Sequence, residues 1–217
     1  MTAYLLSMAL ALTMQASAGP AASPVGEGAQ RLVVPALRRA QSTWKQDACL
    51  SALTVHLNHF VDVLAPGSMK RLFLDSFHFE FYSAGAPERI ILSIKEFRNP
   101  AEDPSSGEFS ENRRDQGGPA ACLTELTVDS GAALELARKY GLTVSIPKDP
   151  PEKNDEHYEY NLQLYRSTLK GKARTAWTIG SSRHRGTTLI RTEGILDIDA
   201  ATGALIGWDP KYRPRKR

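Results

Sequence analysis

The chain has 217 residues, of which 41% are hydrophobic and 24% charged, and a formal net charge of +3 at pH 7. This composition is typical of globular proteins and excludes a disordered chain. Two cysteines exclude a zinc cluster built from three or four thiolates. No run reaches the roughly 20 apolar residues of a membrane-spanning helix, so we expect no stable membrane insertion.

The N-terminus has the pattern of a secretion signal. An apolar run at residues 4–12 precedes Ala16-Ser17-Ala18, the small-x-small pattern that a signal peptidase cleaves, although a positively charged start is missing. We therefore predict a signal peptide over residues 1–18, a flexible mature N-terminus over 19–30, and a periplasmic or secreted location. The alternative is a disordered N-terminus or a core helix.

Export would allow a disulfide between Cys49 and Cys122, because exported proteins meet an oxidising compartment. The segments Cys49–Val55 and Cys122–Val128 share five of seven residues, and both alternate apolar and polar side chains as strands do. If these strands are neighbours, the two Cα atoms should lie within about 7 Å of each other. The alternative is a pair of buried free thiols.

The first half of the chain is predicted to be a helix followed by antiparallel strands. Residues 31–45 have helical periodicity, with Val33, Leu37, Ala40 and Trp44 on one face. Strands are expected at 49–57, 73–82 and 90–94, with turns at 65–68 and 84–87. The second strand carries an aromatic face formed by Phe73, Phe77, Phe79 and Phe81. Residues 99–120 lack any periodicity and are predicted to be a loop or linker.

The second half repeats this order. After a strand at 122–128, Asp129-Ser130 fits a helix N-cap and Gly141 is placed to end the helix. The predicted helix buries Ala133, Leu134, Ala137 and Tyr140, and further strands are expected at 142–146, 158–165, 175–181, 189–198 and 204–206. Asp199, Thr202 and Gly203 form the turn of the last hairpin, where Gly203 supplies a positive φ.

The predicted fold class is therefore α+β, with two helix-on-antiparallel-sheet modules in tandem. The first module spans residues 31–98 and the second spans 121–208. The loop at 99–120 joins them, and a basic tail at 209–217 follows and can touch anionic surfaces.

The second half resembles a PepSY-type module. The resemblance rests on Leu134, Ala137 and Gly141, on Trp177, and on the final hairpin of residues 195–205, which has the Asp-Ala-x-Thr-Gly pattern. It covers residues 128–208, and with lower specificity 31–97; the chain departs from the pattern at 147–156 and 170–172. PepSY domains are similar to propeptide segments of secreted metallopeptidases, so the resemblance implies an exported binding module whose protein partner is a peptidase.

No constellation in the sequence predicts catalysis or a cofactor. His56 and His59 are three residues apart without an obvious third ligand, and a zinc site needs at least three protein ligands. His78 is expected to be partly exposed, while His157 and His184 are expected in polar loops. A Gly-x-Ser-x-Gly motif is missing, and the spacing within residues 180–184 does not provide triad geometry.

Four arginines, Arg174, Arg183, Arg185 and Arg191, lie on or beside two predicted strands. They could bind an anionic partner, or they could pair with acids on neighbouring strands. No basic face interleaved with aromatics is visible, so no nucleic-acid partner is expected.

The sequence patterns predict an exported, non-enzymatic binding module of the cell envelope, and the PepSY resemblance implies that it is peptidase-inhibitory or protein-interacting. One alternative is a small-molecule carrier with a pocket between helix and curved sheet. The second alternative is a hydrolase whose residues assemble only in space.

Overall fold

The computed structural model describes residues 28–65, 67–97, 108–115, 121–123, 127–147, 150–152, 155–169, 172–209 and 211–212. The predicted signal peptide at 1–18 lies outside the described residues, as does most of the flexible segment at 19–30 and of the basic tail at 209–217.

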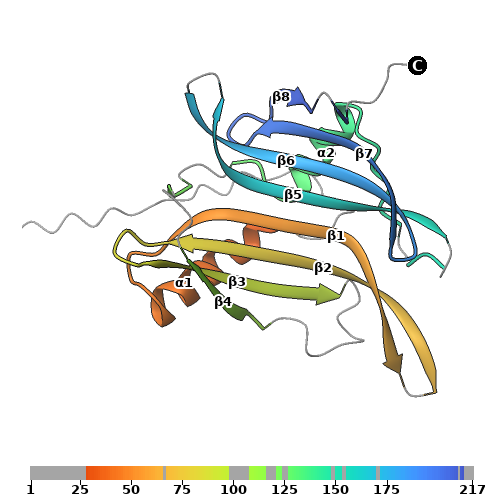
Figure 1. Ribbon diagram of the computed structural model, residues 1–217, viewed down its shortest axis with the longest axis horizontal. Helices are drawn as coiled ribbons and strands as arrows, with labels where there is room; N and C mark the ends of the chain where they lie inside the picture. The colour runs from red at the N-terminus through yellow and green to blue at the C-terminus, as the bar shows by residue number, and fades with distance from the viewer. Residues whose placement is uncertain are drawn as a thin grey trace, which may run out of the picture.

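Eight antiparallel strands form one sheet in the order β4-β3-β2-β1-β5-β6-β7-β8, and both helices lie on the same side of it (Figure 1). Each helix precedes four strands in the chain. The elements are α1 (Gln30–Thr43), β1 (Cys49–Ala65), β2 (Ser68–Tyr82), β3 (Glu88–Phe97), β4 (Ser110–Asp115), α2 (Ser130–Lys139), β5 (Glu156–Leu169), β6 (Lys172–Arg185), β7 (Thr188–Asp199) and β8 (Leu205–Trp208).

The predicted fold class of two tandem α+β modules is wrong, because the strands of both halves belong to one continuous sheet. Residues Ala52–Leu57 of β1 pair antiparallel with Tyr160–Tyr165 of β5. We call this ladder the seam. Without it, each half would expose a row of unpaired backbone N–H and C=O groups along its first strand, and pairing the two strands satisfies both rows.

The core lies between the sheet and the two helices. On β2, Phe77, Phe79 and Phe81 are buried as the alternation predicts, and Trp177 on β6 is fully buried. The helix α1 was expected to pack through Val33, Leu37 and Trp44, which are only partly buried; its buried residues are Leu32, Ala36 and Ala40. The small alanines let α1 approach β2 and β3 closely. The face of α1 that packs on the sheet is therefore the one with Leu32 and Ala36, one position before the expected Val33 and Leu37.

Two side chains, those of Asp129 and Ser130, join the two helices at their N-termini. Asp129 precedes α2, as predicted, but its carboxylate Oδ1 accepts a 2.9 Å hydrogen bond from the backbone N–H of Gln30 in α1. The hydroxyl of Ser130 likewise accepts from the N–H of Ala29, at 2.9 Å. The second half therefore caps the helix of the first.

Replacing Asp129 with Ala should lower the free energy of unfolding by about 1 kcal/mol, the usual cost of losing a helix-capping acceptor. Urea denaturation of the two proteins measures the difference. Asp129→Asn is the matched control, because its amide oxygen can still accept from Gln30. An equal loss in Asp129→Asn would show that charge, rather than the cap, is what Asp129 contributes.

Three sequence-based assignments of secondary structure fail locally. The expected linker at 99–120 contains β4, whose six side chains are all exposed and therefore show no apolar periodicity. The described residues of the expected strand at 122–128 are not strand, although the Leu123 N–H donates to the Leu50 carbonyl at 2.7 Å. Residues 142–146 are also irregular.

Candidate functional site

All five histidines of the chain gather on the sheet although they are far apart in sequence. His56 and His59 are on β1, His78 on β2, His157 on β5 and His184 on β6. The ring centroids of His56 and His78 are 5.5 Å apart, and those of His157 and His184 are 5.7 Å apart. His157 and His184 had been expected in loops, and that expectation is wrong because both strands extend through these polar residues.

The strand registers explain how these side chains meet. His157 is the cross-strand partner of His184, and His56 is the partner of Asn161 across the seam. His157, Glu159 and Asn161 alternate along β5 and so point to the same face. That face is opposite the helices, because the intervening residue Tyr160 is buried in the core.

Glu159 is the centre of the cluster. Its Oε1 lies 3.4 Å from Nδ1 of His59 and 3.3 Å from Nε2 of His157, and its Oε2 lies 3.7 Å from Nε2 of His184. One carboxylate thus contacts three imidazoles from three different strands, and the His59 contact crosses the seam.

Asn58 ends the seam beside this cluster. It adopts a positive φ of 63° at a register shift between β1 and β2, and its side-chain amide donates to the carbonyls of Ser145 and Tyr158, both at 3.0 Å. Leu57 is the last residue of β1 that pairs with β5. Beyond it, the Asn58 side chain provides the hydrogen bond to the Tyr158 carbonyl of β5. From this point β1 continues with β2 and diverges from β5, and we call the resulting opening the fork.

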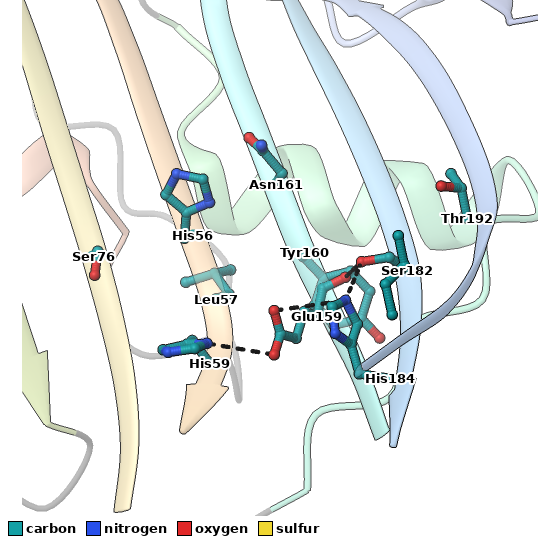
Figure 2. Close-up of a pocket in the computed structure, with 11 residues that line it drawn as sticks. His56, Leu57, His59, Ser76, Glu159, Tyr160, Asn161, Ser182, His184 and Thr192 are labelled. Carbon is teal, nitrogen blue, oxygen red and sulfur yellow. Dashed lines mark hydrogen bonds and ion pairs between the residues drawn. The ribbon is translucent and has the colours of Figure 1, made fainter. Parts of the chain in front are cut away.

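An open groove of about 450 Å³ lies on the sheet face at the fork (Figure 2). In the close-up, the Glu159 carboxylate points between His59 and the paired side chains of Ser182 and His184. The groove is lined by His56, Leu57, His59, Ser76, Glu159, Tyr160, Asn161, Ser182, His184, Leu189 and Thr192.

Burial lowers the pKa of several of these imidazoles. Desolvation lowers the pKa of His184, against the opposing field of Glu159, and the neighbouring His157 and His59 lower it further. Burial likewise lowers the pKa values of His56 and His78. Three histidines of the cluster therefore resist protonation more strongly than a histidine in water does.

His157 is the most enclosed member of the cluster. Its side chain is 3% exposed, and the ring of Phe60 lies 4.7 Å from its own. Because an ionised carboxylate only accepts hydrogen bonds, Nε2 of His157 donates to Glu159. The other ring nitrogen, Nδ1, is buried and has no hydrogen-bond partner among the residues described.

Ser182, His184 and Glu159 do not form a catalytic triad. Ser182 Oγ is 3.0 Å from Nε2 of His184, which is the start of a serine–histidine pair. In a catalytic triad the acid binds the other ring nitrogen and so holds the tautomer. Here Glu159 approaches the same nitrogen, Nε2, that faces the serine. Within the described part of the chain, no three His, Cys, Asp or Glu side chains are arranged to hold a metal ion.

The arginines singled out from the sequence each lie beside a carboxylate. Arg183 contacts Glu156 and Glu193 at 3.0 and 3.2 Å, Arg185 contacts Glu156, and Arg191 contacts Glu193 at 2.7 Å. Arg174 lies 3.7 Å from Asp199. Arg174, Arg183 and Arg185 thus pair with acids on neighbouring strands, whereas Arg191 and Glu193 both lie on β7.

Asp199, Thr202 and Gly203 make the expected hairpin turn between β7 and β8. Oδ1 of Asp199 accepts from the N–H groups of Ala201 and Thr202 and from the Thr202 hydroxyl, each at 3.0 Å. Burial opposes ionisation of Asp199, but the hydrogen bonds from Thr202 and Ala201 outweigh it and lower the pKa. Gly203 has φ of +72°.

The predicted disulfide between Cys49 and Cys122 is confirmed, with the two Cα atoms 5.5 Å apart. It joins β1 to the segment that precedes α2, and so links the two halves beside the seam. No family model, curated protein or solved structure matches this chain. Neither helix described by the structure has the length and apolar character needed to cross a membrane.

Sequence reasoning missed Glu159, Asn161 and Ser182. The alternation of polar residues at 157, 159 and 161 is a signal for the open face of a strand. Nothing in that signal shows that β1 would bring His56 and His59 to the same place, because a pairing between distant strands leaves no local pattern.

Proposed function

We propose that this chain is an exported, non-enzymatic binding protein that engages a protein partner at the fork. The observation that carries the proposal is the position of its exposed apolar side chains. In the described part of the chain, four of the seven exposed large hydrophobic residues lie on the two hairpins that flank the groove: Leu64, Met69, Leu189 and Ile190.

The two hairpin ends lie at the same end of the molecule (Figure 1). Leu64 and Met69 are cross-strand partners near the end of the β1–β2 hairpin and are 84% and 61% exposed. Leu189, at the start of β7, is 55% exposed and lines the groove. Protein–protein interfaces typically combine exposed apolar side chains with side chains that form hydrogen bonds.

The carrier alternative is less well supported. It expects a ligand between helix and sheet, whereas Trp177, Tyr160 and Phe79 fill that layer and are each less than 2% exposed. The groove on the opposite face is open to solvent, while small-molecule sites bury most of the ligand's surface.

The disulfide is compatible with an oxidising compartment, which supports export. A peptidase as the partner rests on the resemblance to PepSY modules alone. The proposal therefore separates into a binding surface, argued from the geometry, and the class of its partner.

The test is affinity capture of secreted proteins from the source cells on immobilised mature chain. We expect the double variants Leu64→Ser/Met69→Ser and Leu189→Ser/Ile190→Ser each to weaken retention of the partner at least tenfold, because each removes an apolar anchor. Val34→Ser is the matched control, since Val34 is 42% exposed but lies on α1.

Retention unchanged in both double variants, with circular dichroism showing native folds, would refute the fork as the binding surface. Assays of the captured protein for peptidase activity, with and without the chain, decide the partner's class separately. A partner without peptidase activity would refute only that part.

A further inference from the structure

We propose that the histidine cluster around Glu159 is an acid-sensitive latch that holds the fork closed at neutral pH and releases it on acidification. The latch consists of Glu159 with His59, His157 and His184. Opening of the fork is a property of the chain alone, so it can be measured whether or not a partner is identified.

The first support is the ratio of imidazoles to carboxylates. When these three imidazoles take up protons, three positive charges face one negative charge. The ring centroids of His157 and His184 are only 5.7 Å apart, so their charges repel each other in a partly desolvated site. A single carboxylate cannot compensate for all three.

The second support is the unpartnered nitrogen of His157. Protonation would place a hydrogen on Nδ1, which is buried beside Phe60 without an acceptor among the described residues. A buried N–H without a partner is costly. Movement of the β1–β2 hairpin away from β5 would bring water to Nδ1 and remove that cost.

The remaining charged groups around the cluster are occupied elsewhere. Arg71 binds Asp62, Arg183 and Arg185 bind Glu156, and Arg191 binds Glu193. Asp75 accepts from the Asn58 N–H. Lys95, on β3, adds positive charge near His78 and so opposes protonation.

The direction of the pH effect follows from the lowered pKa of His184. In the closed fork the lowered pKa of His184 disfavours its protonated form, whereas in an open, solvated fork its pKa should return towards the ordinary value of about 6.5. The open state therefore binds more protons as pH falls below about 6.5, and acid favours it. Above that pH the closed state should be insensitive to pH.

The fork can open without separating the halves. The seam between Ala52–Leu57 and Tyr160–Tyr165 and the disulfide both lie to one side of Asn58. Beyond Asn58, β1 is paired with β2 alone. Since His59, His184 and Leu189 line the groove, opening would change the surface to which we assign the partner.

Hydrogen exchange of backbone amides in the mature, oxidised chain tests the latch. Between pH 7.0 and pH 5.0, after correction for the intrinsic exchange rate, we expect protection at residues 157–160 and 58–60 to fall at least tenfold. His184, whose pKa is lowered in the closed fork, contributes up to about tenfold per pH unit below about 6.5. Protection at Phe79 and Ile90, in the core of β2 and β3, should change less than threefold.

The double variant His157→Phe/His184→Gln should keep the fork protected at pH 5.0. His78→Gln is the matched control: His78 lies on the same face and contacts Ser93 rather than Glu159, so this variant should open as the wild type does. If the double variant does not fold, His184→Gln alone decides, and it should reduce the acid-induced loss at least threefold.

Three results would overturn the latch. The first is unchanged protection at the fork between pH 7.0 and pH 5.0. The second is a parallel loss at Phe79 and Ile90, which would indicate global unfolding. The third is opening of the wild-type extent in the folded His157→Phe/His184→Gln variant or, failing that, in His184→Gln.

Discussion

Reduction of the Cys49–Cys122 disulfide should lower the stability of the chain by about 4 kcal/mol, the chain-entropy value for a closed loop of about 70 residues. In a chain of this length that corresponds to a decrease in Tm of roughly 10 °C. The cross-link restricts the conformations of the unfolded chain. Reduction should therefore lower the free energy of unfolding mainly by stabilising the unfolded state. Differential scanning calorimetry with and without reductant measures it.

The double variant Cys49→Ser/Cys122→Ser is the control for reductant effects. Its Tm should match that of the reduced wild type and should not change further when reductant is added. Titration of the unfolded, non-reduced protein should find essentially no free thiol. Two free thiols per chain, or equal Tm values in both redox states, would contradict the expectation.

Trp177→Ala should destabilise the fold by about 3–5 kcal/mol, the range for deleting a large buried aromatic side chain. Trp177 is fully buried between its cross-strand partners Leu164 and Ile198. Its indole N–H also donates to the Val128 carbonyl at 2.8 Å, fixing the start of the α2 segment. Urea denaturation should show a lower midpoint with an unchanged m-value.

Two further variants separate packing from hydrogen bonding. Trp177→Phe keeps most of the ring but leaves the Val128 carbonyl without its donor, which should cost about 1–3 kcal/mol. Trp44→Ala removes the same residue type from a partly buried position after α1 and should cost less than half as much as Trp177→Ala. An equal loss of stability in Trp44→Ala and Trp177→Ala would show that Trp177 does not have the central place in the core that its burial indicates.

The parts of the fold that depend on neighbouring residues could be predicted from the sequence. Alternating phenylalanines specify β2 because side chains on a strand alternate between faces. Asp129 and Gly141 mark the ends of α2, where Gly141 has a φ of +102°. The turn at Asp199–Gly203 follows from hydrogen bonds made within five residues.

The seam could not be predicted in this way. Both β1 and β5 have a buried face and an open face, so their composition allows either an edge or a central position. The sequence pattern predicts two separate modules because each half has its own helix and its own hairpins. Only the three-dimensional register places Leu57 beside Tyr160 and brings His59 to Glu159.

The sequence pattern predicts strands that are shorter than those in the structure, for a related reason. Residues 182–185 of β6 contain no apolar side chain, yet they pair with both β5 and β7. Backbone hydrogen bonds extend a strand regardless of the side chains it carries. The same holds for β4, which pairs with β3 although all six of its side chains are exposed.

The strand order also bears on whether β1 pairs with β5 of its own chain or with β5 of a second copy. Pairings within each half join strands that are consecutive in the chain, so the two halves can form locally before β1 meets β5. Until then, the first strand of one chain can equally well pair with β5 of another, and the product would be a domain-swapped dimer. The intrachain bond between Cys49 and Cys122 ties β1 to the segment leading into its own second half, and so favours the monomeric pairing.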